Sequence, residues 1–171
     1  MRKANAIITV LIFVAFIAHT IVGSLMMLGV DAKVTRMLGD FTLVTIAAHT
    51  IIGIILTIDT IIKIKKAKAS YIKGNEKFWA RRITGFLIIG LMVFHMVIFE
   101  MGRYNLVDMI LMILLVVIIH GHIFINIEPM LISFGVIKYK KVERIIDVVI
   151  TIVSLVAVVA FVIFYFIGIF S

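Results

Sequence analysis

Apolar residues occupy five long runs of the chain, and polar or charged residues gather in the short stretches between them. Each run is close to the roughly 20 residues that an α-helix needs to cross the hydrocarbon core of a bilayer. The pattern therefore predicts an all-α fold, in which residues 1–171 form one polytopic membrane domain. The five transmembrane helices are expected at about residues 5–29, 41–63, 81–102, 106–128 and 145–170.

The composition excludes an ordinary soluble domain. Hydrophobic residues make up 64% of the chain and the mean hydropathy is +1.27, which leaves too few polar residues to cover a surface in water. No small-residue cleavage pattern follows the first run, so we expect that run to be a span rather than a signal peptide. The chain has no cysteine, which excludes disulfides, thiolate metal sites and cysteine-bound iron–sulfur clusters within it.

Lysine and arginine are divided unequally between the two ends of the predicted helices. Of the 17 basic residues, 14 precede the first run or lie between the second and third or the fourth and fifth; the others are Lys33, Arg36 and Arg103. The positive-inside rule then predicts a cytoplasmic N-terminus and an external C-terminus in the cell membrane. The net charge of +8 is therefore interpreted as a topology signal and not as a sign of nucleic-acid binding. Anionic lipid headgroups and an acidic partner surface are secondary interpretations.

All five histidines fall inside the predicted spans. Ionisable residues are costly in hydrocarbon, and their presence there is by default a functional hypothesis. A proton pathway would need carboxylates nearby, but the acidic residues lie near span ends. A zinc site would need three or four ligands at one point. The histidines are His19 in the first span, His49 in the second, His95 in the third, and His120 and His122 in the fourth.

Haem b fits this distribution better. It needs two imidazoles facing each other across a porphyrin with apolar walls, and the core of a helix bundle supplies both. One histidine from each of four helices would hold two bis-histidine haems. His120 and His122 stand about 200° apart around a helix, so only one of them is expected to be an axial ligand.

Two glycines support the same interpretation. Gly23 and Gly53 each follow a histidine, His19 and His49, by four residues and so share its helix face. A missing side chain there would let a flat macrocycle lie against the backbone. The alternative is a small-residue contact between helices.

Two stretches resemble a known family. "FWARRITGFLIIGLMVFH" at 78–95 is similar to an aromatic–Arg–x–Ser/Thr–Gly start of a haem-bearing helix, and "HIFINIEPMLISFG" at 122–135 looks like the end of a fourth helix in short clostridial-type relatives. Together with one histidine in each of the first four spans and none in the fifth, they resemble the membrane-anchor cytochrome b of the succinate dehydrogenase and fumarate reductase family. The resemblance is to its single-chain, five-helix, two-haem type.

The resemblance implies that helices one and three hold one haem b and helices two and four the other. His19 would then pair with His95, and His49 with His122 or His120. His122 is favoured, because it stands four residues before Asn126 in the stretch that resembles the family. Counted from the cytoplasmic charges, the first three histidines lie at similar depths, so the separation of the two haems is left to helix tilt.

The resemblance also implies partners. A flavoprotein subunit and an iron–sulfur subunit would dock on the cytoplasmic face, and this non-catalytic subunit would pass electrons between them and membrane quinone. The direction of electron flow stays open. The alternatives are a b-type cytochrome that serves another flavoprotein and a membrane transporter without haem.

Residues at the span ends are candidates for accessory roles. Arg81 and Arg82, with Lys77, could bind haem propionates, because guanidinium groups bind carboxylates in a bidentate manner; the alternative is topology anchoring. Pro129 is expected to end or kink the fourth helix. Quinone could bind near Asp59, Trp79, Thr84 and Arg82 on the cytoplasmic side, or near Glu100, Asp40 and Arg36 outside.

Overall fold

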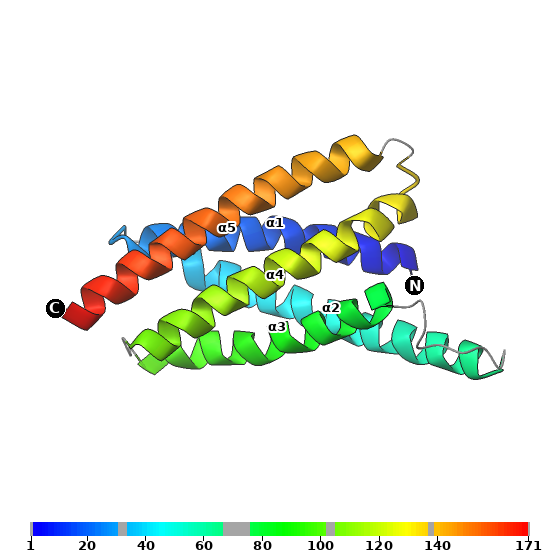
Figure 1. Ribbon diagram of the computed structural model, residues 1–171, viewed down its shortest axis with the longest axis horizontal. Helices are drawn as coiled ribbons and strands as arrows, with labels where there is room; N and C mark the ends of the chain where they lie inside the picture. The colour runs from blue at the N-terminus through cyan, green and yellow to red at the C-terminus, as the bar shows by residue number, and fades with distance from the viewer. Residues whose placement is uncertain (1, 31–33, 67–75, 102–104, 137–138, 171) are drawn as a thin grey trace.

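The computed structural model describes residues 2–30, 34–66, 76–101, 105–136 and 139–170. These residues fold into five α-helices, each of which contains an apolar stretch long enough to cross a bilayer. The all-α, multi-pass membrane architecture predicted from the sequence is therefore confirmed at this level. The helices are α1 (Arg2–Met27), α2 (Val34–Lys66), α3 (Glu76–Met101), α4 (Leu106–Ser133) and α5 (Tyr139–Phe170) (Figure 1).

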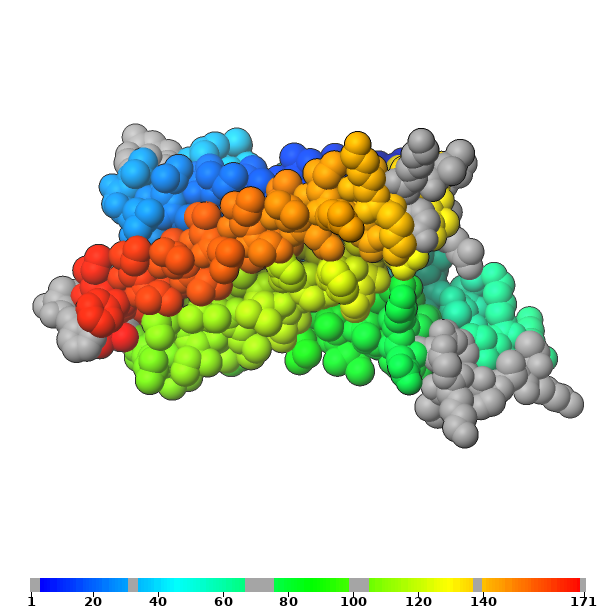
Figure 2. All heavy atoms as spheres, turned by 45° about the horizontal axis from the view of Figure 1, so that its top comes forward, coloured from blue at the N-terminus to red at the C-terminus, as the bar shows by residue number. Residues whose placement is uncertain are grey.

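The helices alternate in direction, so the two termini lie at opposite ends of the bundle (Figure 1). We call these the N-terminal end and the C-terminal end. α1 packs along α2 and α5, α4 packs along α3 and α5, and α1 meets α4 over a shorter stretch. α5 lies across both α1 and α4 on the face shown in Figure 2. Among the described residues α2 and α3, though consecutive, do not pack closely along each other.

Several helix boundaries differ from those predicted. α2, α3 and α5 begin five to seven residues earlier than expected, and α1 ends two residues earlier, at Met27. The expected bounds followed the apolar runs, which mark the part of a helix that lies in hydrocarbon. The hydrogen-bond ladder of a helix continues into the polar flanks, where charged side chains reach water. α2 projects farthest at the N-terminal end (Figure 1).

Of the two alternatives predicted for Pro129, that it ends or kinks α4, the first is wrong, because the helix continues to Ser133. Proline has no N–H and so leaves the carbonyl of Ile125, four residues earlier, without its helical donor. Arg81 of α3 supplies a donor instead, since its Nε lies 3.1 Å from that carbonyl oxygen. A donor from a neighbouring helix is one way in which proline is tolerated inside a membrane span. α4 ends in a glycine cap at Gly135, whose φ is +75°.

The start of α4 is capped by side chains. Asn105 accepts a hydrogen bond from the backbone N–H of Asp108 at 2.9 Å, and its own amide donates to the Asp108 carboxylate at 2.6 Å. Asp108 is buried, and the reciprocal bonds satisfy a helix end that lies against other helices.

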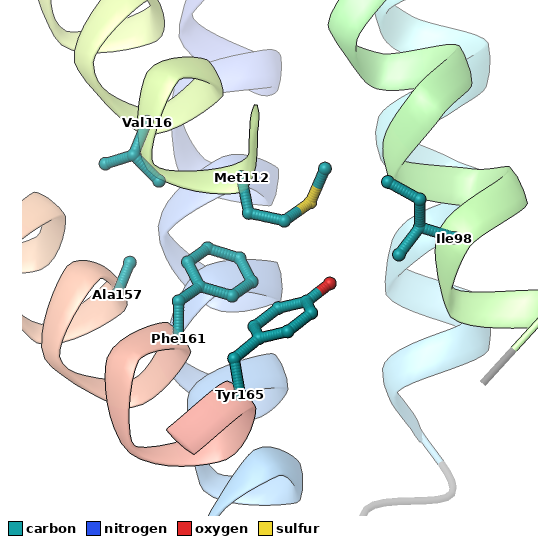
Figure 3. Close-up of a cluster of buried hydrophobic side chains, with 6 residues drawn as sticks. All are labelled: Ile98, Met112, Val116, Ala157, Phe161 and Tyr165. Atoms are coloured by element: carbon teal, nitrogen blue, oxygen red, sulfur yellow. The ribbon is translucent and has the colours of Figure 1, made fainter. Parts of the chain in front are cut away.

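An apolar cluster fills the space between α3, α4 and α5 at the C-terminal end (Figure 3). Met112 and Tyr165 are almost completely buried in it. Large apolar side chains on the outside of the helices are exposed, which suits a hydrocarbon environment. The cluster consists of Ile98, Met112, Val116, Ala157, Phe161 and Tyr165.

The orientation across the membrane stays a prediction. The basic residues Lys63, Lys65 and Lys66 lie at the N-terminal end, where α2 finishes, and they are exposed. Five of the basic residues that enter the charge pattern lie outside the described residues, namely Lys33, Lys68, Lys73, Arg103 and Lys138.

Candidate functional site

His19 of α1 and His95 of α3 face each other inside the bundle. Their ring centroids are 6.2 Å apart and the ring planes are perpendicular, at 89°. With each ligating nitrogen about 2 Å from a metal ion between the rings, two imidazole centroids would also stand roughly 6 Å apart. The separation of this His19/His95 pair is therefore compatible with an iron atom held between the two rings.

The surroundings of the pair place it in the half of the bundle near the C-terminal end. An added Cβ at Gly39, near the start of α2, would lie 3.5 Å from Cε1 of His19. Nδ1 of His95 lies 3.3 Å from the sulfur of Met112, near the start of α4. Nδ1 of His19 is buried without a hydrogen bond, although the backbone of Thr35 lies near this ring.

His49 of α2 and His122 of α4 form the second pair, since they lie close enough to interact electrostatically. Each is hydrogen bonded through Nδ1 to a threonine hydroxyl. Thr9 of α1 lies 3.4 Å from His49, and Thr84 of α3 lies 2.7 Å from His122. Both threonines belong to the first halves of their helices, so this His49/His122 pair lies toward the N-terminal end.

The two pairs are therefore separated along the bundle. Thr9, which contacts the second pair, and His19 of the first pair are ten residues apart on α1, which corresponds to about 15 Å of helix rise. Residue counts from the charged flanks do not reveal this separation. α2 projects beyond the other helices at the N-terminal end (Figure 1), so a count of residues back from its charged end does not measure depth on the same scale as in the other helices.

The threonine contacts indicate which ring nitrogen carries the proton. A hydroxyl has one proton to donate. Thr9 and Thr84 each donate it to the carbonyl four residues earlier in their own helix, at 2.8 and 2.7 Å. With that proton engaged, each hydroxyl oxygen can accept from the histidine, and the tautomer protonated on Nδ1 satisfies both contacts of each hydroxyl. In that tautomer the Nε2 atoms of His49 and His122 keep the lone pair that a metal ion requires.

His95 follows the same rule with a different partner. A thioether sulfur has no proton and can only accept a hydrogen bond. As a hydrogen bond, the contact with Met112 therefore has Nδ1–H of His95 as its donor.

His120 points elsewhere. Its Nδ1 lies 3.3 Å from the hydroxyl of Ser154 on α5. The structure thus brings His122, rather than His120, toward His49, in agreement with the roughly 200° between the two side chains on α4.

Two other glycines lie against the histidine rings, and the expected packing of a haem against Gly23 and Gly53 stays a prediction. A Cβ added at Gly23 or Gly53 would meet nothing within 4 Å, so neither glycine contacts a ring. Instead a Cβ at Gly39 would touch His19, and one at Gly85 would lie 3.6 Å from Cε1 of His122. Gly85 follows Thr84 in the stretch that resembles the family, so a signal for it was present in the sequence. Gly39 has no comparable signal.

Arg81 and Arg82 lie at the N-terminal end, where both act electrostatically on His122. Arg81 is held by the Ile125 carbonyl, as described above. Nε of Arg82 donates to the Thr57 hydroxyl of α2 at 3.0 Å, and its guanidinium carbon lies 3.9 Å from the ring centroid of Phe78. The two guanidinium groups bring positive charge close to the His49/His122 pair.

The other chemistries considered from the sequence find less support. In the part of the chain that the structure describes, no three histidine or acidic side chains gather in a way that could hold a metal ion. Instead, the histidines interact electrostatically as two pairs, His19 with His95 and His49 with His122. Asp59, a candidate for the cytoplasmic quinone site, forms an exposed ion pair with Lys63 at 2.7 Å. The side chain of Glu100 lies outside the described residues.

Comparison of the chain with protein-family models, curated proteins and solved structures found no match.

Proposed function

We propose that this chain is the membrane-anchor cytochrome b subunit of a succinate:quinone oxidoreductase, with two b haems in its helix bundle. His19 and His95 would hold one haem, and His49 and His122 the other. The chain would transfer electrons between cytoplasmic flavoprotein and iron–sulfur subunits and membrane quinone.

One observation carries the haem assignment. His49, His95 and His122 each place Nδ1 against an atom that can accept its proton, a hydroxyl whose own proton has a carbonyl partner or a thioether that has no proton. Metal-bound histidines characteristically donate their second ring N–H in this way, because the bond orients the ring and determines the tautomer. Histidines that only join helices by hydrogen bonds would not require Nδ1 to be the donor in all three cases.

The helix arrangement is compatible with two flat groups. One histidine pair lies between α1 and α3, and the other between α2 and α4. In the described residues neither of these two helix pairs packs closely along its length, so each could have a flat group between its helices. Haem, when bound, supplies a one-electron carrier. The chain supplies the axial nitrogens, the apolar walls that exclude water, and the hydrogen bonds that hold each ring in orientation.

Arg81 and Arg82 would bind the propionates of the haem at the His49/His122 pair. Both lie near His122, and their positive charge would otherwise lie unfavourably close to a metal site. Arg81 is held against α4 by the carbonyl that Pro129 leaves without a helical donor.

The partners are proposed from the resemblance and from the charge pattern. The flavoprotein and iron–sulfur subunits would dock at the N-terminal end, which the positive-inside rule assigns to the cytoplasm. The exposed lysines of α2 are at this end and would face an acidic docking surface or anionic lipid headgroups.

The haem assignment is tested by a reduced-minus-oxidised absorption spectrum of the purified chain, with haem quantified as its pyridine complex. We expect a sharp α-band and close to two haems per chain. A folded but colourless protein, made with ample iron and porphyrin, would refute the proposal and favour a transporter. Purification of the intact complex then tests the partners: covalent flavin and iron–sulfur clusters should accompany the chain, and their absence would favour a different flavoprotein.

A further inference from the structure

The two histidine pairs differ in what accepts their Nδ1 protons. At the His49/His122 pair both acceptors are hydroxyl oxygens, and the contact from Thr84 is short, at 2.7 Å. At the His19/His95 pair the acceptor for His95 is the sulfur of Met112, at 3.3 Å, and Nδ1 of His19 has no hydrogen bond. A thioether is a much weaker acceptor than a hydroxyl.

Met112 is held firmly in this position. It is completely buried, at 0% exposure, in the centre of the apolar cluster at the C-terminal end. Figure 3 shows its side chain running from α4 toward α3, with Phe161 and Tyr165 of α5 packed beside it and Ile98 of α3 opposite the sulfur. Ile98 is three residues after His95, and so lies on nearly the same face of α3.

Such an acceptor affects the iron through its ligand. A strong acceptor on Nδ1–H draws the proton away from the ring and makes the imidazole a better electron donor, which favours the ferric state and lowers the midpoint potential. A weak acceptor has the opposite effect. The chain thus places the pair with weak Nδ1 acceptors, His19/His95, toward the C-terminal end of the bundle. The pair with hydroxyl acceptors, His49/His122, lies toward the N-terminal end.

We propose that Met112 is a positioning residue for His95, which holds the ring in its Nε2-ligating orientation and, as a weak acceptor, gives the haem at the His19/His95 pair a higher midpoint potential than a hydroxyl or carbonyl acceptor would. This inference rests on the proposed function. Met112 acts only through His95.

The test is a redox titration of the purified two-haem protein, whose haem absorbance is fitted with two components. Met112→Leu keeps the volume and removes the acceptor, so it should raise the midpoint potential of one component. Met112→Gln keeps the length and offers a carbonyl oxygen, so it should lower the midpoint potential of that same component. Thr84→Val removes the hydroxyl at the other pair and should raise the other component, which assigns the two.

Met109→Leu is the matched control, because Met109 packs against the same cluster without contacting a histidine in any described interaction. It should leave both potentials unchanged. Two bound haems whose potentials do not respond to Met112→Leu would overturn the inference while leaving the proposed function intact. Shifts of the same sign in the Leu and Gln variants would also overturn it, since they would indicate a packing effect. If the Met112→Gln variant does not fold, the Met112→Leu variant alone tests the inference: a rise in the midpoint potential of one component supports it, and a fall overturns it. A wild-type protein without haem would overturn the proposed function itself, before any variant is compared.

Discussion

Replacing Thr84 by valine tests the bond that orients His122. Valine has the shape of threonine but no hydroxyl, so Nδ1–H of His122 loses the acceptor that lies 2.7 Å away. The Ala80 carbonyl, which also receives the Thr84 hydroxyl proton, still has the helical N–H of residue 84 and stays satisfied. Apart from the hydroxyl's bonds to the Ala80 and Arg81 carbonyls of its own helix, the substitution removes only the interaction between Thr84 and His122.

The size of the effect follows from the burial of the ring. A buried donor left without an acceptor costs about 1–3 kcal/mol, and about 1.4 kcal/mol corresponds to a tenfold change in affinity. Loss of the partner of a metal-bound histidine typically weakens metal binding about 10–100-fold. His122 is half-buried, so we expect one of the two haems to bind about tenfold more weakly, toward the lower end of that range.

The assay follows the transfer of haem from the purified chain to excess apomyoglobin by absorbance. Thr60→Val is the matched control, because Thr60 also donates to the carbonyl four residues earlier, at 2.7 Å, and contacts no histidine in the described interactions. We expect one haem to leave the Thr84 variant faster, and both to stay in the control. Identical haem retention in the two variants would refute the assignment of Thr84 as the partner of a ligand. Loss of both haems from the Thr84 variant would indicate a folding defect instead.

Two further substitutions should give graded results. Thr9→Val should weaken the same haem less than Thr84→Val does, because the contact of Thr9 with His49 is longer, at 3.4 Å; an equal or larger effect in the same transfer assay would contradict this. His122→Ala should leave about one haem per chain, whereas His120→Ala should leave two, because His120 contacts Ser154 on α5. Haem quantified as its pyridine complex distinguishes these outcomes, and the reverse result would make His120 the ligand.

The fold was largely predictable, because in a membrane the length and hydropathy of each run alone nearly determine a span. The misplaced helix starts have a common cause: hydropathy follows the environment of the side chains, whereas a helix ends where its backbone hydrogen bonds end. Pro129 shows a second limit. Whether a proline breaks a helix depends on which group donates to the freed carbonyl, and here that group is Arg81, 44 residues away in the chain.

The site was predictable in part. Five histidines inside the spans indicated buried chemistry, and the angle between His120 and His122 showed that only one of them could face a given partner. The rotation of α4 then decides which one, and that rotation depends on how α4 packs between α3 and α5. The role expected of Gly23 and Gly53 stays a prediction, because spacing along a helix identifies a shared face but not what lies opposite it, and a Cβ at either glycine would meet open space. Gly39 and Gly85 touch rings that belong to other helices.

The sequence by itself determined that the chain forms five membrane-spanning helices with a histidine in each of the first four, because hydropathy and helix periodicity are local properties. Only the tertiary structure decided which histidines meet, how far apart the two pairs lie, and that Thr9, Thr84 and Met112 lie against their Nδ1 atoms. Those contacts join different helices, and they depend on the tilt, rotation and projection of each helix relative to its neighbours, which no local pattern encodes.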